Sequence, residues 1–189
     1  FVAGCATIVG TLQLDDRFGP ADPARFDHPP AVLADAPDYW KDVRPLLDQR
    51  CVSCHACYDA PCQLNLTSYA GLTRGANPKA VYSSVRLVAD EPTRLGFDAL
   101  TNAGWRQKGF FPVLNERAQT PEANREGGVM YRMLVLKQMH PGPDSGPVTN
   151  ADLDFSLDRK DTCTRAETFG DYASKHPERG MPFGMPPLT

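Results

Sequence analysis

The fold of this chain is decided by the stretch DVRPLLDQRCVSCH at residues 42–55. Its apolar residues recur at spacings that place them on one face of a helix: Val43, Leu46, Leu47 and Cys51. Asp42 can cap the start of this helix, and Pro45 falls in its first turn, where a missing N–H costs no hydrogen bond. The stretch therefore predicts a helix that ends in a cysteine-rich turn.

Three further segments have helical patterns. One runs from Thr67 or Ser68 to Arg74 and is closed by Gly75, which can end a helix. The others cover residues 122–139, weakened by Gly127 and Gly128, and residues 165–175. No stretch alternates with a period of two, so we expect a mainly α fold with few strands and long irregular loops rich in Pro and Gly.

The chain divides into three parts by composition. Residues 1–14 carry no charge, and we expect them to be the remnant of an export signal or membrane anchor. Val2 to Cys5 resemble a bacterial lipobox, in which Cys5 would be lipidated; a buried N-terminal strand or helix is the alternative. Residues 15–38 contain five prolines, which predicts a linker. Residues 39–189 form the expected domain.

The net charge of −3 comes without any cluster of Lys and Arg. A nucleic-acid-binding protein would show a basic patch, so we expect no nucleic-acid partner.

The motif Cys51-Val52-Ser53-Cys54-His55 is a C-x-x-C-H sequence. Two thiols three residues apart can each add to a haem vinyl group, and the histidine that follows can ligate the iron. The motif predicts one covalent haem c, with Cys51 and Cys54 as its attachment points and His55 as its iron ligand.

Two other cofactors compete for these residues. Cys51, Cys54, Cys57 and Cys62 approach the spacing of a ferredoxin iron–sulfur site, but the last gap is one residue too long and the proline precedes the final cysteine. Zinc is the second alternative, although structural zinc sites usually divide their ligands into two distant pairs. If haem takes two thiols, Cys57 and Cys62 can pair, or one of them can pair with Cys163.

The sixth iron ligand, if there is one, must come from elsewhere in the chain. Met181 and Met185 each precede a proline in an irregular stretch and are our candidates, Met181 first. Their alternative is packing under a loop. His140 and His176 are poorer candidates, expected in exposed loops. Helical spacing suggests core packing for the remaining methionines: Met130, Met133 and Met139.

Several stretches together resemble the bacterial fatty acid cis/trans isomerase family, over residues 39–189. They are DVRPLLDQRC (42–51), CVSCHACYDAPCQLNL (51–66), TSYAGLTRGA (67–76), WRQKGF (105–110), MYRML (130–134), LDRK (157–160) and HPERGMP (176–182).

The resemblance implies a periplasmic haem-c enzyme that converts cis double bonds of membrane phospholipid acyl chains to trans during a stress response. It implies that Cys51, Cys54 and His55 hold the haem, with His55 at the catalytic iron centre and Met181 as the distal candidate. We expect a cytochrome-c-like domain, and the surplus of residues between Gly75 and Thr149 over small carriers predicts an insertion. A cytochrome c normally continues past its Met-Pro loop into a C-terminal helix, and the family's members are several times longer, so we expect a fragment that lacks this helix and further sequence.

The expected chemistry is a temporary weakening of the double bond by ferric iron, which permits rotation without net redox change. Peripheral membrane contact is expected, and Trp105, Phe110 and Phe111 can supply it, although an ordinary core explains them equally well. The alternative function is a monohaem electron-transfer cytochrome; a haem-bearing docking or sensing module is a third.

Overall fold

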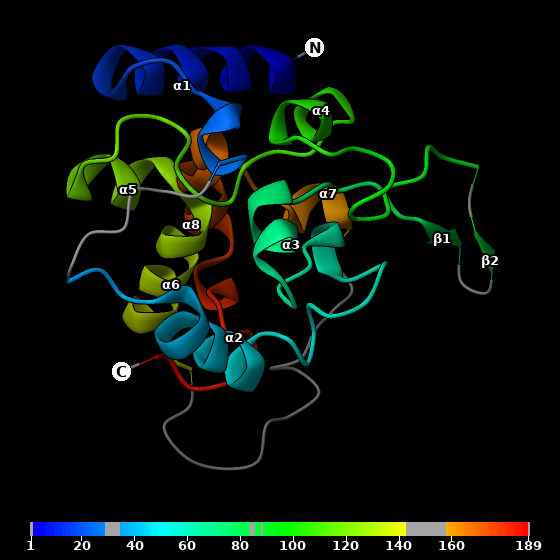
Figure 1. Cartoon of the computed structure of the whole chain (residues 1–189). Helices are drawn as coiled ribbons and strands as arrows, with labels where there is room; N and C mark the ends of the chain where they lie inside the picture. Colours follow the sequence, from blue (N-terminus) through cyan, green and yellow to red (C-terminus); the bar gives the residue numbers. More distant parts are fainter. Residues whose placement is uncertain (1, 29–34, 84–85, 88, 143–157, 189) are drawn as a thin grey trace. The chain divides into compact units, whose positions relative to one another are not determined.

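The computed structural model describes residues 2–28, 35–83, 86–87, 89–142 and 158–188. The chain forms two compact units: one contains residues 1–21 and 113–189, the other residues 22–112. We call them the terminal unit and the motif unit and describe each by itself. The described residues are mainly helical with almost no strands, as predicted (Figure 1). No helix among the described residues combines the length and apolar character needed to cross a membrane.

The motif unit is built from short elements. They are η1 (Pro23–Phe26), the π-helical turn η2 (Tyr39–Val43), α2 (Arg44–Arg50), η3 (Pro61–Gln63), α3 (Tyr69–Arg74), the antiparallel strands β1 (Tyr82–Ser83) and β2 (Arg86–Leu87), and α4 (Asn102–Gln107). The apolar residues of its core include Leu47, Leu66, Leu72, Trp105, Phe110 and Phe111.

The buried aromatic residues settle one question left open by the sequence. Trp105, Phe110 and Phe111 are 4%, 2% and 3% exposed, so they belong to the core and cannot touch a membrane surface. Trp105 and Phe110 contact each other edge to face, with ring centroids 5.2 Å apart.

Local sequence signals explain most helix ends of this unit. Ser68 caps α3 by accepting a hydrogen bond from the N–H of Gly71 at 3.0 Å, and Gly75 ends it with a φ of 83°. A Cβ on Gly75 would lie 2.1 Å from the carbonyl oxygen of Phe111, so the position also needs glycine for a close approach. The expected cap at Asp42 is wrong: Asp38 accepts from the N–H groups of Trp40 and Lys41 and starts the preceding turn η2.

The terminal unit is formed by helices from both ends of the chain. They are α1 (Val2–Phe18), α5 (Pro121–Gly127), α6 (Val129–Met139), α7 (Arg159–Thr162), η4 (Ala166–Thr168), α8 (Phe169–Lys175) and η5 (Pro177–Arg179). The core residues include Phe18, Val113, Val129, Leu136, Phe169 and Tyr172. α6 contacts α8 and η5, and α1 contacts η4 (Figure 1).

Charged contacts help to hold α1 in place. Arg117 is 3% exposed in its side chain; its Nε donates to Asp15 at 2.8 Å, and its Nη2 lies 3.7 Å from Glu167. Arg17 pairs with Glu122 and Glu126 of α5. The helix continues across residues 14 and 15, where the sequence suggested a change from anchor remnant to linker. The prolines at 29 and 30 lie outside the described residues.

Two expectations for the terminal unit are wrong. The helix expected over residues 122–139 is two helices, because Gly128 has the extended angles φ −106° and ψ 117°. Met139 is 68% exposed and does not pack in the core. Met130 and Met133 are half-buried.

Candidate functional site: the cysteine–histidine turn

The C-x-x-C-H motif is a series of turns directly after α2. Cys51 is the C-cap of α2, and its N–H donates to the carbonyl of Leu47. The N–H groups of Cys54 and His55 both donate to the carbonyl oxygen of Cys51, at 3.1 and 3.0 Å. The chain therefore coils tightly enough to keep both thiols and the imidazole in one short turn.

His55 is fixed by the segment that follows. Its Nδ1 lies 3.1 Å from the carbonyl oxygen of Leu64, and its own carbonyl accepts from the N–H of Leu66 at 2.8 Å. A carbonyl oxygen can only accept, so Nδ1 carries the proton and Nε2 keeps its lone pair. Burial lowers the pKa of His55, partly offset by the hydrogen bond to Leu64. A neutral imidazole with one unused nitrogen is the form that ligates a metal.

The cysteines whose side chains the structure describes fall into two chemical groups. Cys51, Cys54 and Cys57 are free thiols; Cys51 is half-buried, and the other two are exposed. Burial raises the pKa of the Cys51 thiol, while the nearby charge of Arg50 lowers it. Cys62 and Cys163 are disulfide-bonded, which excludes a bond between Cys57 and Cys62.

This division bears on the alternative cofactors. An iron–sulfur site would need Cys62 as a free thiolate beside the other three cysteines, but Cys62 is in a disulfide. Within the described ranges no three His, Cys, Asp or Glu side chains gather closely enough to share a metal ion. The ferredoxin-like site disagrees with this arrangement, because one of its four cysteines is oxidised.

Residues 61–63 place Leu64 opposite His55. Cys62 and Gln63 have φ angles of 55° and 47°, in the left-handed region that residues other than glycine seldom adopt. Two consecutive left-handed residues turn the chain back toward the motif. Sequence analysis missed this feature because neither residue is Gly or Asn, the usual signals of such a turn.

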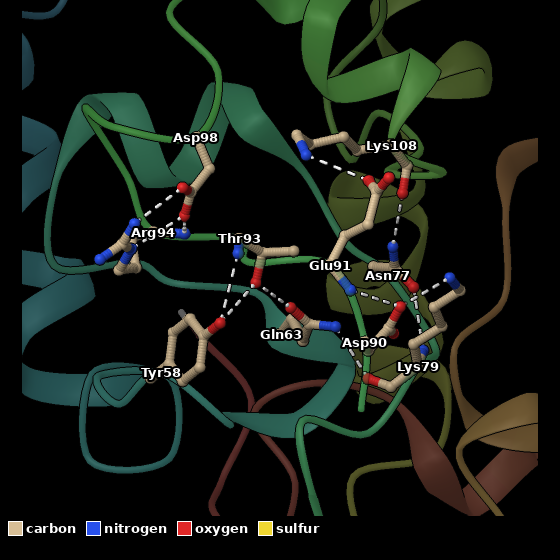
Figure 2. A network of polar contacts seen from close by, with 10 residues as sticks. All are labelled: Tyr58, Gln63, Asn77, Lys79, Asp90, Glu91, Thr93, Arg94, Asp98 and Lys108. Carbon is tan, nitrogen blue, oxygen red and sulfur yellow. Dashed lines mark hydrogen bonds and ion pairs between the residues drawn. The ribbon is translucent and has the colours of Figure 1, made fainter. Parts of the chain in front are cut away.

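A buried polar network holds this reversed turn in place (Figure 2). Gln63, 1% exposed, donates from Nε2 to the carbonyl of Lys79 at 2.9 Å and accepts from Oγ1 of Thr93 at 2.8 Å. The hydroxyl of Tyr58 accepts from the N–H of Thr93 at 3.2 Å. The segment after the motif is therefore tied to residue 93 through side-chain contacts.

Arg74 joins the same network from α3. Its guanidinium donates to the carbonyl oxygens of Thr93 and Gln63 and lies 4.7 Å from the centroid of Phe110. Burial lowers the pKa of Arg74 to about 10. An arginine that remains charged in the core binds two backbone segments at once.

The predicted distal ligands belong to the other unit. Met181 is half-buried in the terminal unit, where its N–H donates to the carbonyl of Met133, and Met185 is half-buried nearby in sequence. His140 is exposed, as expected, whereas His176 is half-buried against the ring of Tyr172. Met181 as the sixth ligand stays a prediction.

Residues 90–189 match the family model described as fatty acid cis/trans isomerase, which is just over half of the 189-residue chain. The protein is therefore an enzyme of the isomerase class that acts on fatty acid double bonds. It belongs to the fatty acid cis/trans isomerase family. No curated protein and no solved structure matches the chain.

Proposed function

We propose that the motif unit carries one covalent haem c, held through Cys51 and Cys54 and ligated by Nε2 of His55. The observation that carries this proposal is the contact of His55 Nδ1 with the Leu64 carbonyl, because it leaves Nε2 free and orients the ring. The two motif thiols are free, as attachment requires. Leu46 on α2 is 52% exposed and offers apolar surface for a porphyrin five residues before Cys51.

The haem would serve the isomerisation of fatty acyl chains. When bound, the haem would supply an electron-withdrawing iron centre for the isomerisation of an alkene, a reaction that needs no net oxidation or reduction. Residues of the motif unit would hold the haem and orient its histidine ligand. Cys51 and Cys54 would hold the group covalently, and the hydrogen bond from His55 to Leu64 orients the imidazole that would bind its iron.

The network around Thr93 supports the link between the motif and the family's activity. The family match begins at residue 90, so the motif itself lies outside it. However, Thr93 lies within the matched segment and hydrogen-bonds Gln63 directly (Figure 2). The first part of the matched segment and the cysteine–histidine turn therefore belong to one folded unit.

We further propose that the substrates are phospholipid acyl chains and that the motif unit touches the membrane through residues 94–100. Phe97 and Leu100 are 79% and 83% exposed in this short loop. Exposed large apolar side chains at a tight turn can enter the interfacial region of a bilayer. Arg94 stacks on Phe97 and pairs with Asp98, which shapes the loop.

A periplasmic location agrees with the cysteine chemistry. Disulfides such as those of Cys62 and Cys163 persist mainly in oxidising compartments, where c-type haem is also attached. We propose export on this basis.

The test is to express the full gene in a host that matures c-type haem and to measure trans fatty acids in its phospholipids. We expect trans chains to accumulate with the unmodified protein and not with Cys51→Ala/Cys54→Ala. Holoprotein confirmed by a pyridine haemochrome spectrum, but without trans chains, would instead indicate an electron-transfer cytochrome. Loss of a Met–iron charge-transfer band in Met181→Ala, but not in Met185→Ala, would support Met181 as the distal ligand.

A further inference from the structure

A cavity of about 610 Å³ lies in the terminal unit, between α1, the end of α5, α6 and the segment from η4 to α8. Ligand-binding cavities usually occupy roughly 300–1,000 Å³, so this one is large enough for a lipid chain. Apart from its α1 side, its walls come from residues 125–173, inside the segment matched by the family model.

The inner wall of the cavity is apolar. It includes Leu14 of α1, Val135 and Leu136 of α6, and Phe169 and Ala173 of α8. Leu136 and Phe169 are each 6% exposed and form its buried floor. Such a surface provides no partner for a polar ligand but can receive methylene groups, each of which gains about 0.8 kcal/mol when it leaves water.

The mouth of the cavity carries exposed side chains. Tyr131 and Met139 line it and are 45% and 68% exposed. An apolar interior that continues into exposed apolar residues suits a ligand that arrives from a lipid surface rather than from water. Tyrosine, with an apolar ring and a polar hydroxyl, favours that boundary.

The charged side chains that line the cavity differ in the partners they contact. Arg17 pairs with Glu122 and Glu126, and Arg132 donates to the carbonyl of Ala166 at 2.7 Å and covers the ring of Phe169. Glu167 lies near Arg117. Arg125 is exposed at the cavity and has no ion pair with any residue that the structure describes.

We propose that this cavity binds one acyl chain of an anionic phospholipid, with the chain along α6 and α8 and the phosphate at Arg125. The inference rests on the proposed function for the class of ligand and adds the place where it binds. A phosphate suits a free guanidinium because the two can form paired, charge-assisted hydrogen bonds. The cavity is thus a substrate site separate in sequence from the cysteine–histidine turn.

The first experiment maps the lipid on the holoprotein. Phosphatidylglycerol vesicles with a photoactivatable diazirine in the acyl chain are irradiated with the protein, and labelled peptides are identified by mass spectrometry. We expect labels in residues 129–139 and 166–173. Labelling confined to other segments, such as 94–100, would overturn the proposal.

Gly170 offers a variant that fills the cavity. It lines the cavity, and a Cβ added to it meets nothing within 4 Å. Gly170→Leu should lower the labelling at least fivefold while the circular dichroism spectrum is unchanged. Ser174→Leu, one turn further along α8 and outside the lining, is the control. Ala173→Leu is a second filling variant; unchanged labelling in a folded filling variant contradicts the proposal.

The second experiment tests the phosphate. Arg125→Gln should weaken binding of 1-oleoyl-lysophosphatidylglycerol about tenfold, a typical effect of losing a hydrogen bond to a charged group. Binding of 1-oleoylglycerol, which has the same chain without phosphate, should not change. Lys175→Gln removes an equal charge from α8 outside the cavity and is the control. Equal losses in both variants would refute a specific phosphate contact.

The two proposals fail separately. Labelled cavity peptides without any trans product would leave the lipid site standing and remove the isomerase haem. Trans product together with labelling outside the cavity would leave the isomerase haem standing and remove the lipid site.

Discussion

The Nδ1 atom of His55 lies 3.1 Å from the carbonyl oxygen of Leu64, nine residues further along the chain. This single contact connects the cysteine–histidine turn with the left-handed residues Cys62 and Gln63, and through Gln63 with the buried network around Thr93. The geometry of the proposed iron ligand thus depends on residues outside the C-x-x-C-H motif.

The free thiols of Cys51, Cys54 and Cys57 provide a test of covalent haem attachment. We expect Cys51→Ala and Cys54→Ala each to remove one thioether bond, and the double variant to lose all pigment on acid–acetone extraction, because no vinyl adduct remains. Cys57→Ala is the matched control: its thiol is also free, yet it lies outside the motif, so the haemochrome spectrum should not change. Pigment that stays with the double variant would refute the attachment sites.

The buried network predicts a loss of stability on Thr93→Val. Valine has the shape of threonine but leaves Oε1 of the buried Gln63 without its donor. An unsatisfied buried group costs about 1–3 kcal/mol, which urea unfolding measures. Arg94→Gln, at the neighbouring exposed ion pair, should have a much smaller effect. Equal stability of Thr93→Val and the unmodified protein would show that the network is not stabilising.

The loop at residues 94–100 predicts membrane affinity. The double variant Phe97→Ser/Leu100→Ser should bind phospholipid vesicles at least tenfold more weakly, because each large apolar side chain contributes up to roughly 1.5–3 kcal/mol when it is fully transferred. Cosedimentation with vesicles measures this affinity. Leu12→Ser, which changes an exposed leucine of α1, serves as the control, and a comparable loss there would argue against this loop.

Tyr172 predicts an alkaline loss of stability in the terminal unit. Burial raises its pKa from 10 to about 12, and its hydroxyl donates to the carbonyl of Arg179. Below pH 10 the phenol is protonated in both states, so its contribution is fully present. As the pH rises from 10 through about 12, the unfolded chain releases the proton first, and roughly 3 kcal/mol is lost.

Chemical unfolding at pH 9 and pH 11.5 measures most of that loss, about 2 kcal/mol, because pH 11.5 still lies below the folded-state pKa of about 12. Tyr172→Phe should lack this part of the pH dependence, whereas Tyr131→Phe, at a 45% exposed tyrosine, should keep it. If the free energy of unfolding falls equally with pH in the unmodified protein and in both variants, the effect comes from groups other than Tyr172.

Local signals made several elements predictable. Ser68 and Gly75 bracket α3 as expected, because a side-chain oxygen and a residue with positive φ satisfy the end groups of a helix in any surroundings. Pro45 stands in the first turn of α2 for a similarly local reason. The motif itself is a local pattern, and its turn after α2 follows from it.

Features that depend on tertiary contacts could not be predicted from the sequence. The carbonyl of Leu64 carries no side-chain signal, and the left-handed angles at Cys62 are imposed by partners such as Asn77, whose N–H donates to the carbonyl of Cys62. The break at Gly128 is another case: the N–H of Met130 donates to the carbonyl of Val113 and separates α5 from α6. Helical periodicity alone cannot reveal such competing hydrogen bonds.

The presence of both free and disulfide-bonded cysteines makes the relative timing of haem attachment and disulfide formation important. A thiolate can attack a nearby disulfide, and Cys57 lies five residues before the oxidised Cys62. Until the thiols of Cys51 and Cys54 are consumed, both can attack the disulfide together with Cys57. Early thioether formation would remove these two nucleophiles, so the yield of correctly crosslinked protein should depend on how fast the porphyrin is supplied relative to oxidation.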